Sequence, residues 1–387
     1  MNNLYLDIAI VLMFYTPLSN ISMLVLNPNE KSNIPTAASW HDVLISKKIA
    51  LGFDGYIDSI VKVVKKQNED GSQQFFEDIT DFGNYIVKKA NRNFSLELKQ
   101  ELLKVGGNMP ITANAFAKLG CKVDCVGALG LPDIHHIFQQ MSPNCTLYSY
   151  AEPGMSTAIE FDNSKMMMAE STQINSADWS YIRDTIGLDQ LKSVFCGKDL
   201  VGLLNWSEVA HSTGIWAGLL EEVLPFTRNG VQKPIGLFDL SDCSKKTRSQ
   251  LLEALELLNG FSRYWNVVLS LNRNESTLVY EALMGNTKES PAIGETAAAI
   301  HNALGISKVV VHHPAEACCY DADGLTWCST PQLSNPKLLT GAGDNFNTGF
   351  CAAMLLEMNT AEALAMGHRL TTHYIAHGES PQFTNLF

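Results

Sequence analysis

The chain has 387 residues, of which 46% are apolar, so it can bury the core of one large α/β domain with a smaller addition, or of two domains. A formal net charge of −12 without any block of Lys or Arg argues against a nucleic-acid partner. The nine cysteines contain no C-x-x-C spacing. We therefore expect no structural zinc site, and a reduced protein in the cytoplasm.

The first residues, 1–47, are interpreted as an N-terminal extension. Residues 8–14 are continuously apolar, but Asp7 lies at the edge of this run and the first lysine is Lys31. The positive flank of a signal peptide is therefore missing, and the run is too short to span a membrane. We expect no membrane partner, and a single domain over residues 48–387.

The first half of this domain predicts mostly short strands, because apolar and β-branched residues alternate between turn signals. The expected strands lie at residues 48–53, 57–65, 73–79, 122–129, 145–150, 157–161 and 166–169. Two helices are expected, at residues 94–103 and 111–119.

The second half alternates apolar strands with helical segments, which is typical of a parallel sheet covered by helices on both faces. The expected strands lie at residues 200–205, 235–239, 267–271 and 308–312. The expected helices lie at residues 214–224, 246–258, 276–283 and 293–304. Ligands of such sheets bind beyond the carboxyl ends of the strands, where Asn205, Asp239 and Asn272 fall.

The most informative segment is residues 339–350, LTGAGDNFNTGF, which predicts a tight turn that opens a buried helix. The first turn of a helix carries unpaired N–H groups and a partial positive charge. Gly341, Ala342 and Gly343 leave room for an anion beside these groups, and Asp344 could accept a proton from a hydroxyl there. An anion site next to a base suits phosphoryl transfer to an alcohol. The alternative is an ordinary turn whose carboxylate complements the helix dipole.

A second constellation, Asn272 and Glu275, follows an expected strand and opens a helix. Three residues apart, both side chains can face one pocket, and their oxygens suit Mg²⁺ with retained waters. The same spacing also fits a capping box, which has no role in binding.

A third group lies near the first strand. Gly106, Gly107 and Asn108 offer backbone N–H groups and an amide side chain to a polyhydroxylated ligand, or form a plain glycine turn. Asp54 and Asp58 could accept two hydrogen bonds from sugar hydroxyls, or be solvated turn acids.

Other motifs are absent or weak. There is no G-x-x-x-x-G-K-[ST] phosphate loop and no H-R-D and D-F-G set of a protein kinase. The His312-His313 pair has no third ligand at metal-binding spacing. A nucleotide-dependent oxidoreductase would rest only on scattered glycines.

Three segments together resemble the ribokinase-like (PfkB) carbohydrate kinase family. These are residues 106–120, GGNMPITANAFAKLG, the Asn272 to Glu275 element, and LTGAGDNFNTGF. The resemblance implies an α/β fold with a doubly wound, mostly parallel sheet, helices on both faces and a small β lid. It places the lid strands at about 57–79 and 145–169.

The resemblance also implies roles for single residues, with ATP and Mg²⁺ as cofactors. Asp344 would take the proton from the sugar hydroxyl, beside an anion hole formed by residues 341–343. Asn272, Thr340, Gly341 and Gly343 would contact ATP, and Glu275 would hold Mg²⁺ through water. Asp54, Asp58, Gly106, Gly107 and Asn108 would bind the sugar.

The sequence therefore predicts an ATP-dependent kinase for a hydroxyl of a sugar or a sugar-like small molecule. The first alternative is a nucleoside or vitamin-precursor kinase. The second is a sugar-binding regulator on a decayed kinase scaffold. The lid is also a candidate interface for a homodimer.

Overall fold

A computed structural model describes residues 37–162, 164–227, 232–285, 291–330, 333 and 336–386. Among these residues, the largest element is a nine-stranded sheet. Its strands are β1 (Lys48–Gly52), β5 (Lys122–Gly127), β6 (Cys145–Ser149), β9 (Leu200–Leu203), β10 (Ile235–Asp239), β11 (Asn266–Asn272), β12 (Lys308–His313), β13 (Glu316–Asp321) and β14 (Gly324–Ser329). The spatial order is β14-β13-β12-β11-β10-β9-β1-β5-β6.

The strands from β12 to β6 pair in parallel, and β13 and β14 add an antiparallel hairpin at one edge. The central strands β1, β9 and β10 are almost entirely buried, as expected for parallel strands covered on both faces. The carboxyl ends of the parallel strands therefore share one edge, where the polar residues predicted to bind ligands lie.

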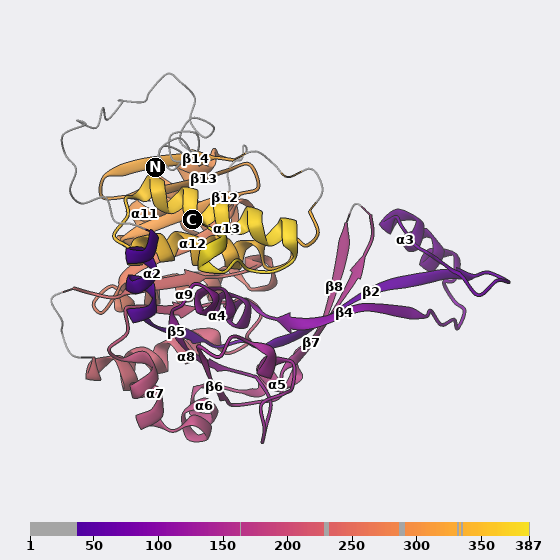
Figure 1. Cartoon of the computed structure of the whole chain (residues 1–387), viewed down its shortest axis with the longest axis horizontal. Coiled ribbons are helices and arrows are strands. Elements are labelled where there is room, and N and C mark those ends of the chain that lie inside the picture. The colour runs from indigo at the N-terminus through magenta and orange to yellow at the C-terminus, as the bar shows by residue number, and fades with distance from the viewer. Residues whose placement is uncertain are drawn as a thin grey trace.

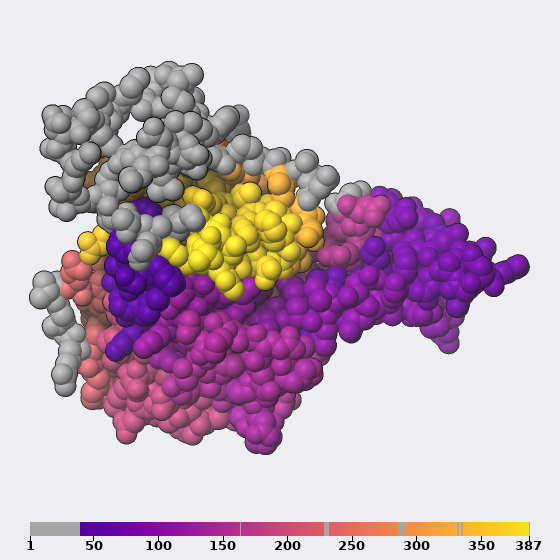
Figure 2. All heavy atoms as spheres, viewed as in Figure 1, coloured from indigo at the N-terminus to yellow at the C-terminus, as the bar shows by residue number. Residues whose placement is uncertain are grey.

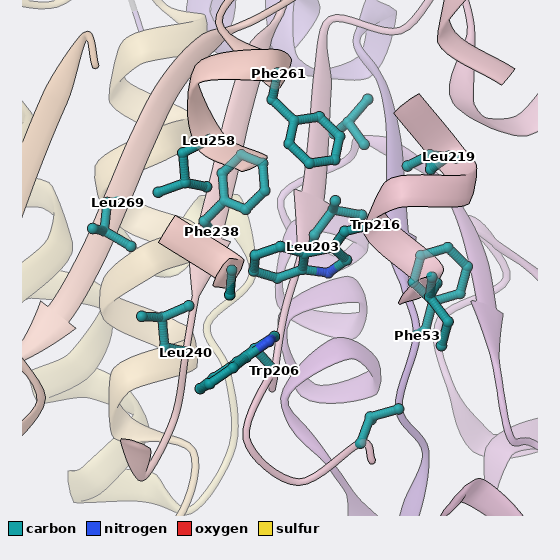
Figure 3. Close-up of a cluster of buried hydrophobic side chains, with 14 of the residues drawn as sticks. Phe53, Leu203, Trp206, Trp216, Leu219, Phe238, Leu240, Leu258, Phe261 and Leu269 are labelled. Carbon is teal, nitrogen blue, oxygen red and sulfur yellow. The ribbon is translucent and has the colours of Figure 1, made fainter. Parts of the chain in front are cut away.

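Helices cover both faces of this sheet (Figure 1). One face packs on α2 (Ala37–Ser46), α4 (Asn108–Lys118), α12 (Ala342–Leu355) and α13 (Thr360–His377). The other packs on α6 (Trp179–Ile186), α7 (Leu188–Phe195), α8 (Ser212–Gly218), α9 (Arg248–Phe261), α10 (Arg273–Met284) and α11 (Ile293–Leu304). Large aromatic side chains fill this second layer, among them Trp206, Trp216, Phe238 and Phe261 (Figure 3). The predicted doubly wound α/β class is thus confirmed.

A separate five-stranded sheet forms the lid. Its strands are β2 (Tyr56–Gln67), β3 (Gln73–Phe75), β4 (Leu98–Gly106), β7 (Gly154–Glu160) and β8 (Lys165–Glu170). Helix α3 (Ile79–Lys88) packs at its far end, and the short α5 (Thr172–Ser176) follows β8. The lid projects from the body as an arm, and the C-terminal helices lie beside its base (Figure 2).

The structure corrects two details of the predicted elements. Residues 94–103, expected to be a short helix, contain the start of strand β4, which pairs with β2 from Tyr56 to Val63. Tertiary pairing overrides the helix preference of the local Leu, Lys, Gln and Glu residues. Residues 145–150, expected in the lid, form β6 at the edge of the main sheet instead, because they pair with β5. The lid from this region is limited to the β7–β8 hairpin.

The described part of the predicted extension is helix α2, whose Leu44 is buried against the core of the domain. Residues 1–36, including the apolar run at 8–14, lie outside the described residues. Within the described residues, no helix combines the length and apolarity that a membrane crossing requires.

Candidate active site

The site is built around the start of α12. Gly341 is the N-cap residue, and its φ of +95° lies in the left-handed region that favours glycine. A Cβ at this position would also lie 2.6 Å from the hydroxyl oxygen of Tyr374. The turn directs Asp344 inward, where its carboxyl is buried and its Oδ1 accepts a 3.2 Å hydrogen bond from Thr112 Oγ1 of α4.

The electrostatic environment of Asp344 raises its pKa well above the ordinary value. Burial is the main cause, and the negative charges of Asp239 and Asp54 act in the same direction. The hydrogen bond from Thr112 and the charge of Lys104 oppose this rise. A carboxyl with a raised pKa is a better proton acceptor than a free aspartate, so Asp344 is suited to general-base chemistry.

One of the backbone N–H groups at the start of α12 already donates a hydrogen bond within the protein. The Ala342 N–H donates to Leu339 O at 3.1 Å, so this amide is not free for an anion. The Gly343 and Asp344 amides lie in the first helical turn and have no backbone acceptor among the described residues. The Tyr374 hydroxyl donates to Thr340 O at 2.6 Å and holds the preceding residue in place. Within the predicted anion site at residues 341–343, the Ala342 amide is thus engaged, whereas the Gly343 amide and that of the following Asp344 are available, and the site itself stays a prediction.

Asp54 caps the start of helix α4. Its two carboxylate oxygens accept hydrogen bonds from the N–H groups of Asn108 and Met109, both at 2.8 Å, at the start of α4. The side-chain amide of Asn205 donates to it at 2.6 Å. Burial raises the pKa of Asp54 to about 6, although these three hydrogen bonds favour the charged form. The side-chain oxygen of Asn205 is buried without a hydrogen-bond donor among the described residues, so it can accept from a ligand.

Asp58 lies on lid strand β2, directly opposite Lys104 on β4. It is buried, and its pKa is raised by burial and lowered by the charges of Lys104 and Lys165. Its carboxylate occupies the space that a Cβ of Gly106 would fill, and Asp54 does the same at Gly107, where a Cβ would lie 2.7 Å from Asp54 Oδ2. The glycine pair is thus required because two carboxylates approach its backbone.

A chain of polar side chains connects the strand ends. The side-chain amide of Asn108 donates to Ser241 Oγ at 3.0 Å, and the Ser241 N–H donates to Asp239 at 2.9 Å. Asp239 also accepts a 2.8 Å hydrogen bond from Asn347 of α12, whose amide oxygen accepts from Ser270 Oγ at 2.5 Å. This network fixes α4 and α12 against β10 and β11.

Asn272 and Glu275 form a capping box at the start of α10. The Glu275 side chain accepts from the N–H and the side-chain amide of Asn272, at 2.9 Å and 2.6 Å, and the Asn272 oxygen accepts from the Glu275 N–H at 2.9 Å. Burial, followed by the charge of Asp239, raises the pKa of Glu275 well above its usual range. Asn272 and Glu275 therefore form the helix-capping box that their spacing allowed.

The same residues carry negative charge that bears on Mg²⁺ binding. Asp239, Asp242 and Asp344 all repel the charge of Glu275, so a divalent cation close by would relieve this repulsion. Among the described residues, no three His, Cys, Asp or Glu side chains are placed to ligate one metal directly. Carboxylate oxygens can hold Mg²⁺ through its waters, so the role predicted for Glu275 stays a prediction.

Comparison with known proteins decides the family. The family model for prokaryotic ketohexokinase matches residues 36–387. The chain belongs to the prokaryotic ketohexokinase family. A ketohexokinase of Haloferax volcanii is 28% identical over 341 residues, which cover 88% of this chain and 89% of the relative. This member of the family is a carbohydrate kinase that uses ATP to phosphorylate a sugar hydroxyl, as the sequence predicted.

Solved structures confirm the ribokinase-like fold of this family member. A probable sugar kinase from Rhizobium etli aligns with a TM-score of 0.63 and 12% identity, covering 88% of this chain and 96% of that protein. A ribokinase from Thermotoga maritima aligns with a TM-score of 0.57 and 15% identity, covering 88% and 97%.

The structure brings the predicted residues of the lid, the glycine pair and the α12 start to one place, and it adds residues that the sequence did not single out. Lys104, Lys165 and Tyr374 lie outside the recognised segments, and Thr112 lies within residues 106–120 without having been singled out. Each reaches the site through contacts between segments distant in sequence. Asn205 had one signal, its place after a strand of the parallel sheet.

Proposed function

We propose that this kinase transfers the terminal phosphoryl group of ATP to a hydroxyl of a ketohexose. The observation that carries the proposal is the buried carboxyl of Asp344 in the first turn of α12, where the Gly343 and Asp344 amides have no backbone acceptor among the described residues. The substrate class is supported by the match to ketohexokinases over most of the chain.

In the proposed reaction, Asp344 accepts the proton of the sugar hydroxyl. The oxygen then forms a bond to the terminal phosphorus of ATP, and the bond from that phosphorus to the bridging oxygen breaks, with ADP as leaving group. The amides of Gly343 and Asp344 stabilise the charge on the transferring group. The raised pKa of Asp344 helps this step, because a more basic carboxylate accepts the proton of the sugar hydroxyl more readily.

The sugar is positioned by lid and body together. Asp58 and the free oxygen of Asn205 accept hydrogen bonds from sugar hydroxyls, and Asn108 donates from the start of α4. Asp54 supports this site from beneath by capping α4, so its predicted contact to sugar is replaced in our proposal by a positioning role. Packing of Ile60 and Ala158 of the lid against Leu338 and Tyr374 closes the site to water.

Mg²⁺ held through water at Glu275, with Asn272 beside it, would neutralise charge on the phosphates of ATP. Thr340 and Gly341 are proposed to border the phosphates from the loop. ATP as substrate and nine free thiols favour the cytoplasm. The lid remains the candidate dimer interface, since its strands β4, β7 and β8 expose Leu102, Met155 and Met168.

A substrate panel tests the proposal. Purified protein is given ATP and Mg²⁺ with fructose and other ketohexoses, and with aldohexoses, ribose and adenosine as controls. Product is identified by phosphorus NMR, which distinguishes a sugar phosphate from free phosphate. Turnover with ketohexoses at least about tenfold above that with the controls supports the proposal. A preference for adenosine would support the nucleoside alternative, and ketohexose binding without any product would support a regulator.

A further inference from the structure

Two lysines lie on the face of the lid that turns toward the body. Lys104 of β4 pairs with Asp58, and Asp58 pairs with Ser156 of β7. Side chains two or four residues apart on a strand share a face, so Glu160 lies on the face of Ser156, and its partner in β8 is Lys165. Ile60 and Ala158 on this face pack against Leu338 and Tyr374, which shows that the face covers the active site.

Both lysines reach the loop before α12. Lys165 Nζ donates a hydrogen bond to Thr340 Oγ1. Lys104 Nζ donates to the hydroxyl of Tyr374 at 3.4 Å, and that hydroxyl donates to Thr340 O at 2.6 Å. Two lid strands therefore converge on one residue, which directly precedes the predicted anion site.

Both ammonium groups lie near carboxylates without pairing closely with one. Among the described residues, Asp58 and Glu160 attract both lysines from a distance, and Asp344 also attracts Lys104. Loss of water lowers the pKa of both ammonium groups, and for Lys165 the neighbouring Lys104 adds to the effect. Two cations held near each other, with one hydroxyl contact each, form a site for an anion with more than one oxygen.

We propose that Lys104 and Lys165 bind the phosphoryl group during its transfer, and that they complete the anion site at residues 340–343 when the lid closes. The inference rests on the proposed function and adds the lid as a source of catalytic charge. Thr340 and Tyr374 accept hydrogen bonds from the two lysines next to the proposed phosphate site. Closure of the lid would then also bring the two lysine charges to the phosphoryl group. Transfer of that group to water would be slow while the lid is open, because these charges are not yet in place.

Lys104→Met and Lys165→Met, singly and together, test the inference. Each loses a charge that acts on the transition state, so kcat should fall about 10²-fold per lysine, with more in the double variant. Binding of fructose, measured by calorimetry, should stay within about threefold. The phosphorylated product, purified from the wild-type reaction, should bind at least about tenfold more weakly, since only it carries the anion. Lys104→Arg and Lys165→Arg should recover part of kcat, because they restore the charge.

The matched control is the double variant Lys66→Met/Lys99→Met, which removes two exposed charges from the same lid sheet and should keep wild-type kinetics. Thermal melting accompanies every variant, and the Met variants should melt at or above the wild-type temperature because a charge that has lost water and has no close ion pair has been removed.

The outcomes separate the two proposals. If the wild type does not phosphorylate ketohexoses, the proposed function fails. If the wild type does, but the Lys104→Met/Lys165→Met enzyme keeps kcat and product affinity within about twofold, the lysine inference alone is overturned. A loss of kcat with a large drop in melting temperature and no recovery by Arg would also overturn it, since the lysines would then only support the fold.

Discussion

Thr112 donates a hydrogen bond from its Oγ1 to Oδ1 of Asp344 over 3.2 Å, and so links α4 to the start of α12. The bond favours the ionised carboxyl, whereas burial and the charges of Asp239 and Asp54 favour the neutral form. The balance leaves the pKa of Asp344 well above that of a free aspartate. Together with the charge of Lys104, the pH at which the base becomes active is thus set by residues on four other segments.

We predict an acid limb in the pH profile of kcat/KM that reflects this balance. Asp344 accepts a proton only when ionised, so activity should fall as the pH drops through its raised pKa, and the limb should lie above the range of an ordinary aspartate. Thr112→Val keeps the shape of the side chain but removes the hydrogen bond, so the pKa should rise further and the limb should move to higher pH. Initial rates across a pH series check both, and a limb unmoved in Thr112→Val would contradict the assignment.

Asp344→Asn should lower kcat by about 10²- to 10⁴-fold, because the variant lacks the proton acceptor but keeps the shape of the site. Sugar binding, measured by calorimetry, should stay close to wild type, and thermal stability should not fall, since a buried charge has been removed. Asp184→Asn, at an exposed carboxyl on α6, is the control. Near-normal turnover in Asp344→Asn would refute the role of the base.

Asp54→Ala should lower the free energy of unfolding by about 2–4 kcal/mol, because it leaves the N–H groups of Asn108 and Met109 and the Asn205 amide without their acceptor. Urea titration followed by circular dichroism measures the change. Asp184→Ala, whose partner Arg183 is at the surface, should cost less than about 1 kcal/mol. A loss of sugar affinity without any loss of stability would show that Asp54 contacts the sugar rather than the helix.

Gly106→Ala should weaken sugar binding, because its Cβ would take the space of the Asp58 carboxylate and displace it. We expect KM for the ketohexose to rise at least about tenfold, the loss of one charged hydrogen bond being worth about 1.5–3 kcal/mol. Gly83→Ala is the matched control, since its Cβ would meet open space in helix α3 of the same lid. Unchanged KM in Gly106→Ala would exclude Asp58 from the sugar site.

Local patterns were sufficient for the parts of this protein whose structure depends on short stretches of chain. The turn at Gly341 needs a left-handed residue and the helix after it follows a 3.6-residue period, so both could be recognised from residues 339–350. The alternating strands and helices of the second half likewise predicted the parallel sheet and the edge where Asn205, Asp239 and Asn272 lie.

The tertiary structure decided everything that depends on which segments meet. Residues 98–106 are a strand because β2 lies beside them, although their composition also suits a helix. Asp54 is a helix cap because β1 ends beneath α4, 54 residues away along the chain. Lys104 and Lys165 face Thr340 only because the lid folds over the start of α12, and the pKa of Asp344 depends on charges from the same distant contacts. Contacts between remote segments cannot be recognised from a local sequence pattern. The spacing of apolar residues in each segment reflects only the geometry of its own strand or helix, and not which segment it will contact.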